Sequence, residues 1–157
     1  MTAMSVHPNQ TANPTIKMAN GTVIVPDAWI DNQSFDQYDA LVMPGGMDAA
    51  NTFKGSQQVQ QLIKSFHQSG KLVTAICASP IAFSTGIIGN GFKLTSHPCT
   101  KSELNQFEYL EERVVHDESK KIITSRGPGT AMEFALEIVK TLCGESVCES
   151  VARPLVK

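Results

Sequence analysis

The chain has 157 residues, 41% of them hydrophobic, which is enough for one compact core and too short for two ordinary domains. We therefore expect residues 1–157 to form a single domain. Thirteen basic and fifteen acidic side chains give a formal charge of −2, so the chain lacks the positive field that attracts nucleic acids and anionic membranes. We expect neither a nucleic acid nor a membrane as its partner.

The N-terminus and the cysteines indicate a cytoplasmic protein. No apolar run approaches the roughly 20 residues of a membrane span, and residues 1–14 lack the basic start and apolar centre of a signal peptide. The four cysteines show neither C-x-x-C pairing nor a zinc-like spacing with histidine. In a reducing compartment they are expected to be free thiols, and the sequence predicts no metal site.

Apolar segments of strand length alternate with helix-length segments, which is typical of α/β units around a parallel sheet. Strands are predicted at residues 22–27, 39–46, 71–76 and 92–96. The i, i+3, i+4, i+7 spacing of apolar residues within 56–71 predicts an amphipathic helix that ends near Gly70.

The C-terminal part predicts two further strands joined by a polar turn near residues 117–120, followed by a long helix over 130–143. His116 and Asp117, which lie before that turn, are interpreted as solvated surface. Pro80 suits the first turn of a helix that begins just after Cys77.

Cys77 lies where the strand predicted at 71–76 passes into the next helix. In open α/β sheets ligands bind at the carboxyl ends of the strands, and a sharp strand-to-helix turn pushes the side chain there outward. A helix N-terminus favours thiolate over thiol and directs the amide of Ala78 towards whatever the sulfur attacks. Cys77 is therefore a candidate nucleophile. The alternative is that its thiol is a small buried hydrophobic group.

Two further elements belong to the same predicted edge of the sheet. Gly45 and Gly46 follow a strand and would let the backbone approach a ligand closely, so Gly46 is a candidate oxyanion donor beside Ala78. The alternative is a plain turn. His97 follows the next short strand, where it either orients the thiol and carries a proton or is an ordinary loop residue.

Arg126 precedes a Pro/Gly turn at residues 127–129. Its guanidinium either contacts a substrate or anchors this turn by hydrogen bonds to carbonyl oxygens, and the turn chemistry favours the second role. Cys99 stands two residues after His97. It either lines the same cleft or is a partly buried loop thiol, and the loop thiol is the favoured interpretation.

Four short motifs, LVMPGG, AICASP, TSHP and TSRGPGT, occur in this order along the chain. Together they resemble the ThiJ/PfpI superfamily, specifically the branch of the parkinsonism-associated protein deglycase and its bacterial relatives, over about residues 22–157. The resemblance implies a flavodoxin-like three-layer α/β sandwich with a mostly parallel sheet. It also implies a homodimer and an oxidation-sensitive cysteine at the strand-to-helix turn.

The function implied by the resemblance is that of a cysteine-dependent glyoxalase or deglycase. It would act without any cofactor on methylglyoxal-type 2-oxoaldehydes and their glycated adducts, and would protect against oxidative stress, with chaperone-like behaviour. The implied site residues are Cys77 and His97 for catalysis and Gly45, Gly46, Ala78 and Arg126 for oxyanion and substrate binding. The alternative is a non-catalytic redox-responsive or chaperone-like protein in which Cys77 is oxidised to sulfinic acid.

The chain departs from the family's pattern at two places. Ala78 stands where the protease-like members have a histidine, so peptidase activity is disfavoured. The chain also starts near the family's second strand, so the first strand and helix, with a glutamate that hydrogen-bonds the nucleophilic cysteine, have no counterpart. We therefore expect this chain alone to turn over substrate slowly or not at all. The sequence does not decide whether it is an enzyme. Because the lost helix normally contributes to dimer contacts, a homodimer and a monomer both remain open.

Overall fold

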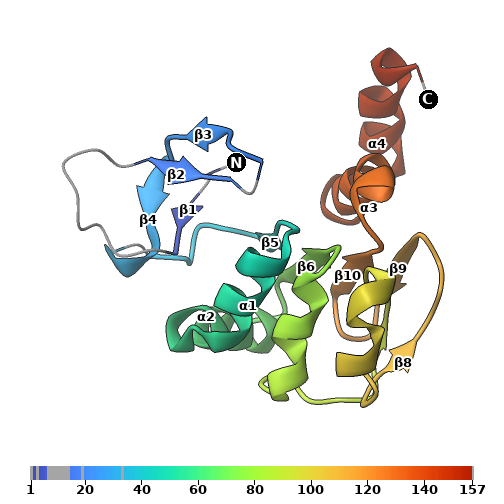
Figure 1. The fold of residues 1–157 in the computed structure, drawn as a ribbon. Helices are drawn as coiled ribbons and strands as arrows, with labels where there is room; N and C mark the ends of the chain where they lie inside the picture. Colours follow the sequence, from blue (N-terminus) through green and yellow to red (C-terminus); the bar gives the residue numbers. More distant parts are fainter. Residues whose placement is uncertain (1, 3, 7–14, 19, 33, 157) are drawn as a thin grey trace. The chain divides into compact units, whose positions relative to one another are not determined.

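The computed structural model describes residues 2, 4–6, 15–18, 20–32 and 34–156 (Figure 1). Its contacts divide the chain into two compact units, Met1–Tyr38 and Asp39–Lys157. The single domain expected over the whole chain stays a prediction. In the described residues, no helix is both long and apolar enough to cross a membrane.

The first unit is built from short strands. Its elements are β1 (Met4–Ser5), β2 (Ile16–Lys17), β3 (Val23–Ile24), β4 (Ala28–Trp29) and the 3₁₀ helix η1 (Ile30–Asn32). β1 pairs in parallel with β4, and β2 pairs antiparallel with β3. Gly21, whose φ is 86°, provides the turn of the β2–β3 hairpin. The observed strand β3 is shorter than the strand predicted at 22–27 and lies within it.

The second unit contains a four-stranded sheet in the order β5, β6, β10, β9. These strands are β5 (Ala40–Met43), β6 (Leu72–Ile76), β10 (Ile122–Ser125) and β9 (Val114–Asp117). β5, β6 and β10 run parallel, and β9 lies antiparallel to β10 (Figure 1). The mostly parallel α/β sheet predicted from the sequence is confirmed. The carboxyl ends of its three parallel strands lie at one edge.

The helices of this unit follow the strands. They are α1 (Met47–Gly55), α2 (Gln57–Gln68), α3 (Ala131–Cys143) and α4 (Glu145–Ala152), with shorter 3₁₀ helices η2 (Ser79–Thr85), η3 (Pro98–Glu103), η4 (Pro128–Thr130) and η5 (Arg153–Leu155). α2 begins after Ser56, whose hydroxyl accepts a 3.3 Å hydrogen bond from the amide of Val59. It is followed by Gly70 at a φ of 66°, so the predicted helix and its end are confirmed.

The alternation of side chains along the strands gives the sheet two apolar faces. Leu72 and Ile123 pack with Phe134 of α3 on one face. Val73 and Ile122, which point the other way, are fully buried, and α2 packs against β5 and β6. β6 and β10 are buried on both faces, as is typical of parallel strands that are covered on both sides.

The segment after Cys77 differs from its prediction, because it forms the 3₁₀ helix η2 instead of an α-helix. Its backbone hydrogen bonds span three residues, as between the amide of Ile81 and the carbonyl of Ala78 at 3.2 Å. Pro80 occupies the first turn as expected. The turn is tight and short, and it directs the chain away from β6.

The polar turn predicted at 117–120 joins β9 to β10, but His116 and Asp117 are more than solvated surface. The Nδ1 of His116 lies 2.9 Å from the carboxylate of Glu137. Asp117 also has partners. Its carboxylate accepts a 2.9 Å hydrogen bond from the amide of Lys93 and a 2.6 Å bond from the hydroxyl of Ser119. Lys93 starts β7 (Lys93–Leu94), which pairs in parallel with β8 (Glu108–Tyr109). Asp117 therefore ties the β9–β10 hairpin to the segment that leads to His97.

Candidate active site

Cys77 follows β6 in a conformation that L-residues rarely adopt. Its φ is 66°, in the left-handed region. Its amide donates to the carbonyl of Ser125 at 2.9 Å, and its carbonyl accepts from the amide of His97 at 2.8 Å. Such a conformation costs on the order of 1–3 kcal/mol and persists where its surroundings fix it. Cys77 therefore has the backbone of a strand-to-helix elbow, and its side chain is partly exposed.

The turn after β5 lies directly against Cys77. A Cβ atom placed on Gly45 would lie 2.8 Å from the Cβ of Cys77, a distance at which one of the two residues must move. The fully buried hydroxyl of Ser79 donates a hydrogen bond to the carbonyl of Pro44, which joins this turn to the start of η2. Gly45 thus lies beside the thiol, as the sequence predicted. Ser79, which the sequence analysis missed, holds the two loops together.

The two candidate oxyanion donors stand next to these residues. Gly46, at a φ of 113°, precedes α1, and Ala78 follows Cys77. Among the residues that the structure describes, neither backbone amide has a hydrogen-bond acceptor. Ala78 is only 3% exposed, and an unpaired buried amide is rare in folded proteins. These two unpaired amides can donate to a ligand oxygen, and their role as oxyanion donors stays a prediction.

His97 contacts Cys77 through its backbone and Cys99 through its ring. Its Nδ1 lies 2.9 Å from the Sγ of Cys99 and accepts a 3.3 Å hydrogen bond from the Cys99 amide, which caps η3. A Cβ atom on Gly127 would lie 3.6 Å from the Cδ2 of His97, so the loop after β10 packs against the ring. Cys99 is exposed, which contradicts the favoured interpretation of a partly buried loop thiol.

Arg126 anchors the loop that it precedes. Its Nη1 donates a 2.9 Å hydrogen bond to the carbonyl of Glu111, and its amide donates to the carbonyl of Arg113 at 3.1 Å. Its guanidinium also lies 3.9 Å from the carboxylate of Glu111. A hydrogen bond and the charge from Lys101, and the charge of Arg126, hold the pKa of Glu111 below its ordinary value. Arg126 thus has the anchoring role that the turn chemistry favoured, and its contact with a substrate stays a prediction.

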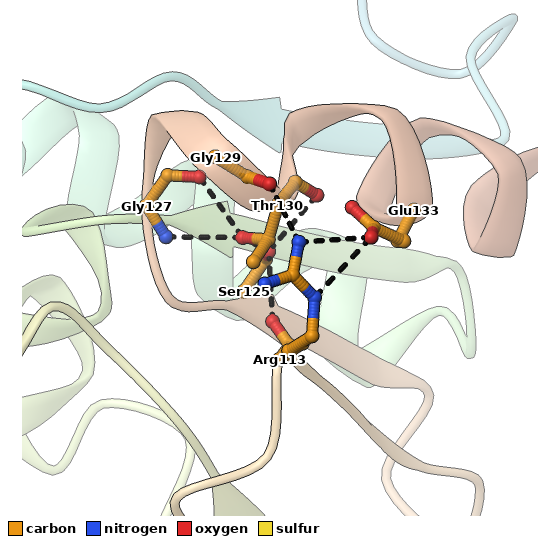
Figure 2. A network of polar contacts seen from close by, with 6 residues as sticks. All are labelled: Arg113, Ser125, Gly127, Gly129, Thr130 and Glu133. Carbon is orange, nitrogen blue, oxygen red and sulfur yellow. Dashed lines mark hydrogen bonds and ion pairs between the residues drawn. The ribbon is translucent and has the colours of Figure 1, made fainter.

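The loop after β10 is also held by Arg113, which the sequence analysis missed. Its Nη2 donates to the carbonyl of Gly129 at 2.6 Å and to the carboxylate of Glu133 at 2.9 Å (Figure 2). The guanidinium therefore bridges the Pro/Gly turn and the first turn of α3. No sequence pattern pointed to Arg113, because its partners are 16 and 20 residues away.

Two buried hydroxyls, those of Ser125 and Thr130, also hold the loop after β10. The hydroxyl of Thr130 lies 2.6 Å from that of Ser125 and accepts a 3.1 Å hydrogen bond from the amide of Gly127 (Figure 2). Because Gly127 packs against His97, these bonds position one wall of the site. Hydroxyl residues on both sides of a Pro/Gly turn are the signal that would have predicted them.

The reactive groups at this edge of the sheet are a thiol, an imidazole and two unpaired amides. Within the described part of the chain, no three His, Cys, Asp or Glu side chains are grouped to hold a metal ion. A thiol beside two amide donors is suited to attack a carbonyl carbon and to stabilise the alkoxide that forms.

The sequence matches the DJ-1/PfpI family over residues 2–141. Protein dj-1beta of Drosophila melanogaster is 36% identical over 142 residues, which cover 90% of this chain and 75% of that protein. The glutathione-independent glyoxalase DJR-1.2 of Caenorhabditis elegans is 36% identical over 143 residues, covering 89% of this chain and 74% of that protein. The crystal structure of Drosophila melanogaster DJ-1beta has a TM-score of 0.85 and 37% identity, over 90% of this chain and 76% of that one.

These matches confirm the predicted resemblance and the flavodoxin-like fold, and they correct the extent of the resemblance. The family match begins at residue 2, not near residue 22, so it includes most of the first unit. The short motifs that carried the resemblance lie only in the second unit, so they gave no sign that the family match extends to the earlier residues. The chain belongs to the DJ-1/PfpI family.

Proposed function

We propose that this protein is a glyoxalase and deglycase that acts on methylglyoxal-type 2-oxoaldehydes and their adducts, with Cys77 as the nucleophile. The observation that carries the proposal is the backbone of Cys77, which is held in a left-handed conformation at the carboxyl end of β6. The unpaired amides of Gly46 and Ala78 support it. The name of the C. elegans relative, a glutathione-independent glyoxalase, supports the reaction class.

In the proposed reaction the Cys77 thiolate attacks the aldehyde carbon, and the alkoxide that forms accepts hydrogen bonds from the amides of Gly46 and Ala78. A proton then moves from that carbon to the neighbouring carbonyl carbon, with His97 as the carrier. The hemithioacetal thereby becomes a thioester of the 2-hydroxy acid. Water hydrolyses the thioester, which releases the acid and restores the thiol.

The test is lactate formation from methylglyoxal by the purified chain, its Cys77→Ser variant and a Cys143→Ser control. Cys143 is an exposed thiol at the end of α3. We expect slow lactate formation by the wild type and a rate at least about 100-fold lower in Cys77→Ser, because serine is a far weaker nucleophile without an activating base. The control should keep the wild-type rate. Lactate formation that survives in a folded Cys77→Ser variant would refute the proposal.

A second candidate is a redox-responsive protein in which Cys77 is oxidised to sulfinic acid. The partial exposure of Cys77 favours this function, as does a Toxoplasma gondii DJ-1 structure described as oxidized, at 30% identity and a TM-score of 0.81. Intact-mass analysis after mild peroxide treatment distinguishes the two functions. Two added oxygens on Cys77, in a chain that forms no lactate, would favour the redox function.

We also propose a homodimer, because α3 and α4 expose the apolar side chains of Leu142, Val147 and Val151. Light scattering on the purified chain tests this. A mass of twice 17.0 kDa supports the dimer, and a mass of 17.0 kDa contradicts it. The cytoplasmic location, the protection against oxidative stress and the chaperone-like behaviour stay predictions.

A further inference from the structure

We infer that Cys99 is a second reactive thiol, which forms an intramolecular disulfide with Cys77 once a peroxide has oxidised Cys77. This inference shares Cys77 with the proposed function but does not require glyoxalase turnover. In this inference Cys99 protects Cys77 from irreversible oxidation, a role that no residue has in the proposed reaction.

Cys99 and His97 form a thiol–imidazole pair. The 2.9 Å separation of Nδ1 and Sγ is within hydrogen-bonding range, and the Cys99 amide also donates to Nδ1 at 3.3 Å. Since Nδ1 accepts this amide, it is the unprotonated nitrogen of the neutral ring, and it is placed to take the proton of the Cys99 thiol. The thiolate is the form that attacks oxidised sulfur, and the exposure of Cys99 makes it accessible.

His97 connects the segment that contains Cys77 to the segment that contains Cys99. Its amide donates to the carbonyl of Cys77 at 2.8 Å, and Cys99 follows two residues later in the first turn of η3. That turn is closed by a 3.0 Å hydrogen bond from the amide of Thr100 to the carbonyl of His97, so Cys99 stays near the contact. A disulfide requires Cα atoms within about 7 Å, so this turn must reach that separation from Cys77 when the bond forms.

The other two thiols lack these features. Cys148 is buried in α4, and its S–H donates to the carbonyl of Leu136 at 3.3 Å. Cys143 is exposed, but it ends α3 and has no imidazole within hydrogen-bonding distance in the described part of the chain. Exposure alone therefore does not single out Cys99, whereas its pairing with His97 does.

The chemistry is balanced with hydrogen peroxide as the oxidant. The Cys77 thiol reacts with one peroxide to give a sulfenic acid and water. The Cys99 thiolate attacks the sulfenic sulfur, the S–OH bond breaks, and the hydroxide takes up the proton held by His97 to leave as water. Without Cys99, a second peroxide adds another oxygen to Cys77 and gives the sulfinic acid.

The experiment treats the wild-type chain, Cys99→Ser and Cys143→Ser with a small excess of hydrogen peroxide, followed by alkylation, trypsin digestion without reduction and mass spectrometry. Cleavage after lysine places Cys77 in the peptide 72–93 and Cys99 in the peptide 94–101. We expect the wild type and Cys143→Ser to give a cross-linked pair of these peptides that is two hydrogens lighter than their sum. Cys99→Ser should instead give the peptide 72–93 with two added oxygens.

The inference is overturned if the wild type gives no cross-linked pair and oxidises to the sulfinic acid as fast as Cys99→Ser does. It is also overturned if the disulfide joins Cys77 to Cys143. Lactate formation is measured on the same samples before oxidation, and Cys143→Ser should keep the wild-type rate. Loss of lactate formation in every sample, with the cross-link still formed, would reject the proposed function and leave this inference standing.

Discussion

The amide of His97 donates a 2.8 Å hydrogen bond to the carbonyl oxygen of Cys77. This bond uses only backbone atoms, so it can survive a substitution of the His97 side chain by any residue other than proline. The position of the thiol and the proposed proton transfer by the imidazole can therefore be separated by mutation.

His97→Asn should reduce activity while the fold is retained. The asparagine oxygen can still accept the amide that caps η3, so thermal stability should change by less than about 1 kcal/mol. Loss of the imidazole should lower the rate of lactate formation by about 10²–10⁴-fold and remove the limb of the pH–rate profile that it controls. An unchanged rate and pH profile would show that another group carries the proton.

Gly45→Ala should damage the site, because the new Cβ atom would lie 2.8 Å from the Cβ of Cys77. We expect a loss of about 1–3 kcal/mol in the free energy of unfolding and at least a tenfold loss of activity. The matched control is Gly55→Ala at the end of α1, where a Cβ atom would meet nothing within 4 Å. Urea unfolding and lactate formation measure both effects, and equal behaviour of the two variants would contradict the close approach at Gly45.

Ser79→Ala should loosen the link between the loop after β5 and the elbow. The variant leaves the carbonyl of Pro44 without its buried donor, which costs about 1–3 kcal/mol. Ser84→Ala is the control from the same 3₁₀ helix, since the Ser84 hydroxyl is buried without a partner in the described structure. Its removal should be neutral or slightly stabilising. The idea that Ser79 joins the loops fails if both alanine variants have the same unfolding midpoint.

Asp117→Asn should reveal a pH-dependent contribution of the β9–β10 turn. Burial opposes ionisation of Asp117, but hydrogen bonds from the Ser119 hydroxyl and the amides of Lys93, Ser119 and Lys120 outweigh it and lower the pKa of this carboxyl below its ordinary value of 3.8. The folded protein therefore binds fewer protons than the unfolded chain as the pH falls through this range.

The stabilisation by Asp117 is consequently complete above its ordinary pKa and is lost as the pH falls through the lowered pKa of the folded protein. We expect Asp117→Asn to be about 1 kcal/mol less stable than the wild type at pH 6, with the difference shrinking below pH 4. Urea unfolding at several pH values measures it. A difference that is constant down to pH 3 would contradict the proposed ionisation.

The sequence predicted the sheet and the elbow well because their signals are local. The apolar runs of β5, β6 and β10 and the glycines beside Cys77 are each visible within a few residues. The parts it missed depend on contacts between distant residues. Arg113 reaches Gly129, and the hydroxyl of Ser79 reaches Pro44, only after the strands have paired. In the first unit only β3 fell within a predicted strand, because two-residue strands carry no period.

The contact between Cys99 and His97 was also not predictable from the sequence, although the two residues are close along the chain. The spacing of His97 and Cys99 allowed two interpretations, and only the turn of η3 brings Nδ1 to 2.9 Å from the sulfur. A two-residue separation fixes no contact until the backbone between the residues is known.

Competitive alkylation measures whether the elbow makes Cys77 the reactive thiol for 2-oxoaldehydes. The folded chain is treated with iodoacetamide at increasing methylglyoxal concentrations, and the labelling rates of Cys77 and Cys143 are followed by peptide mass spectrometry. We predict that methylglyoxal protects Cys77 at concentrations that leave the exposed Cys143 unprotected, because the unpaired amide of Ala78 next to Cys77 can hold the adduct oxygen. Equal protection of both thiols, or a Cys77 that is not labelled in the folded chain, would contradict the claim.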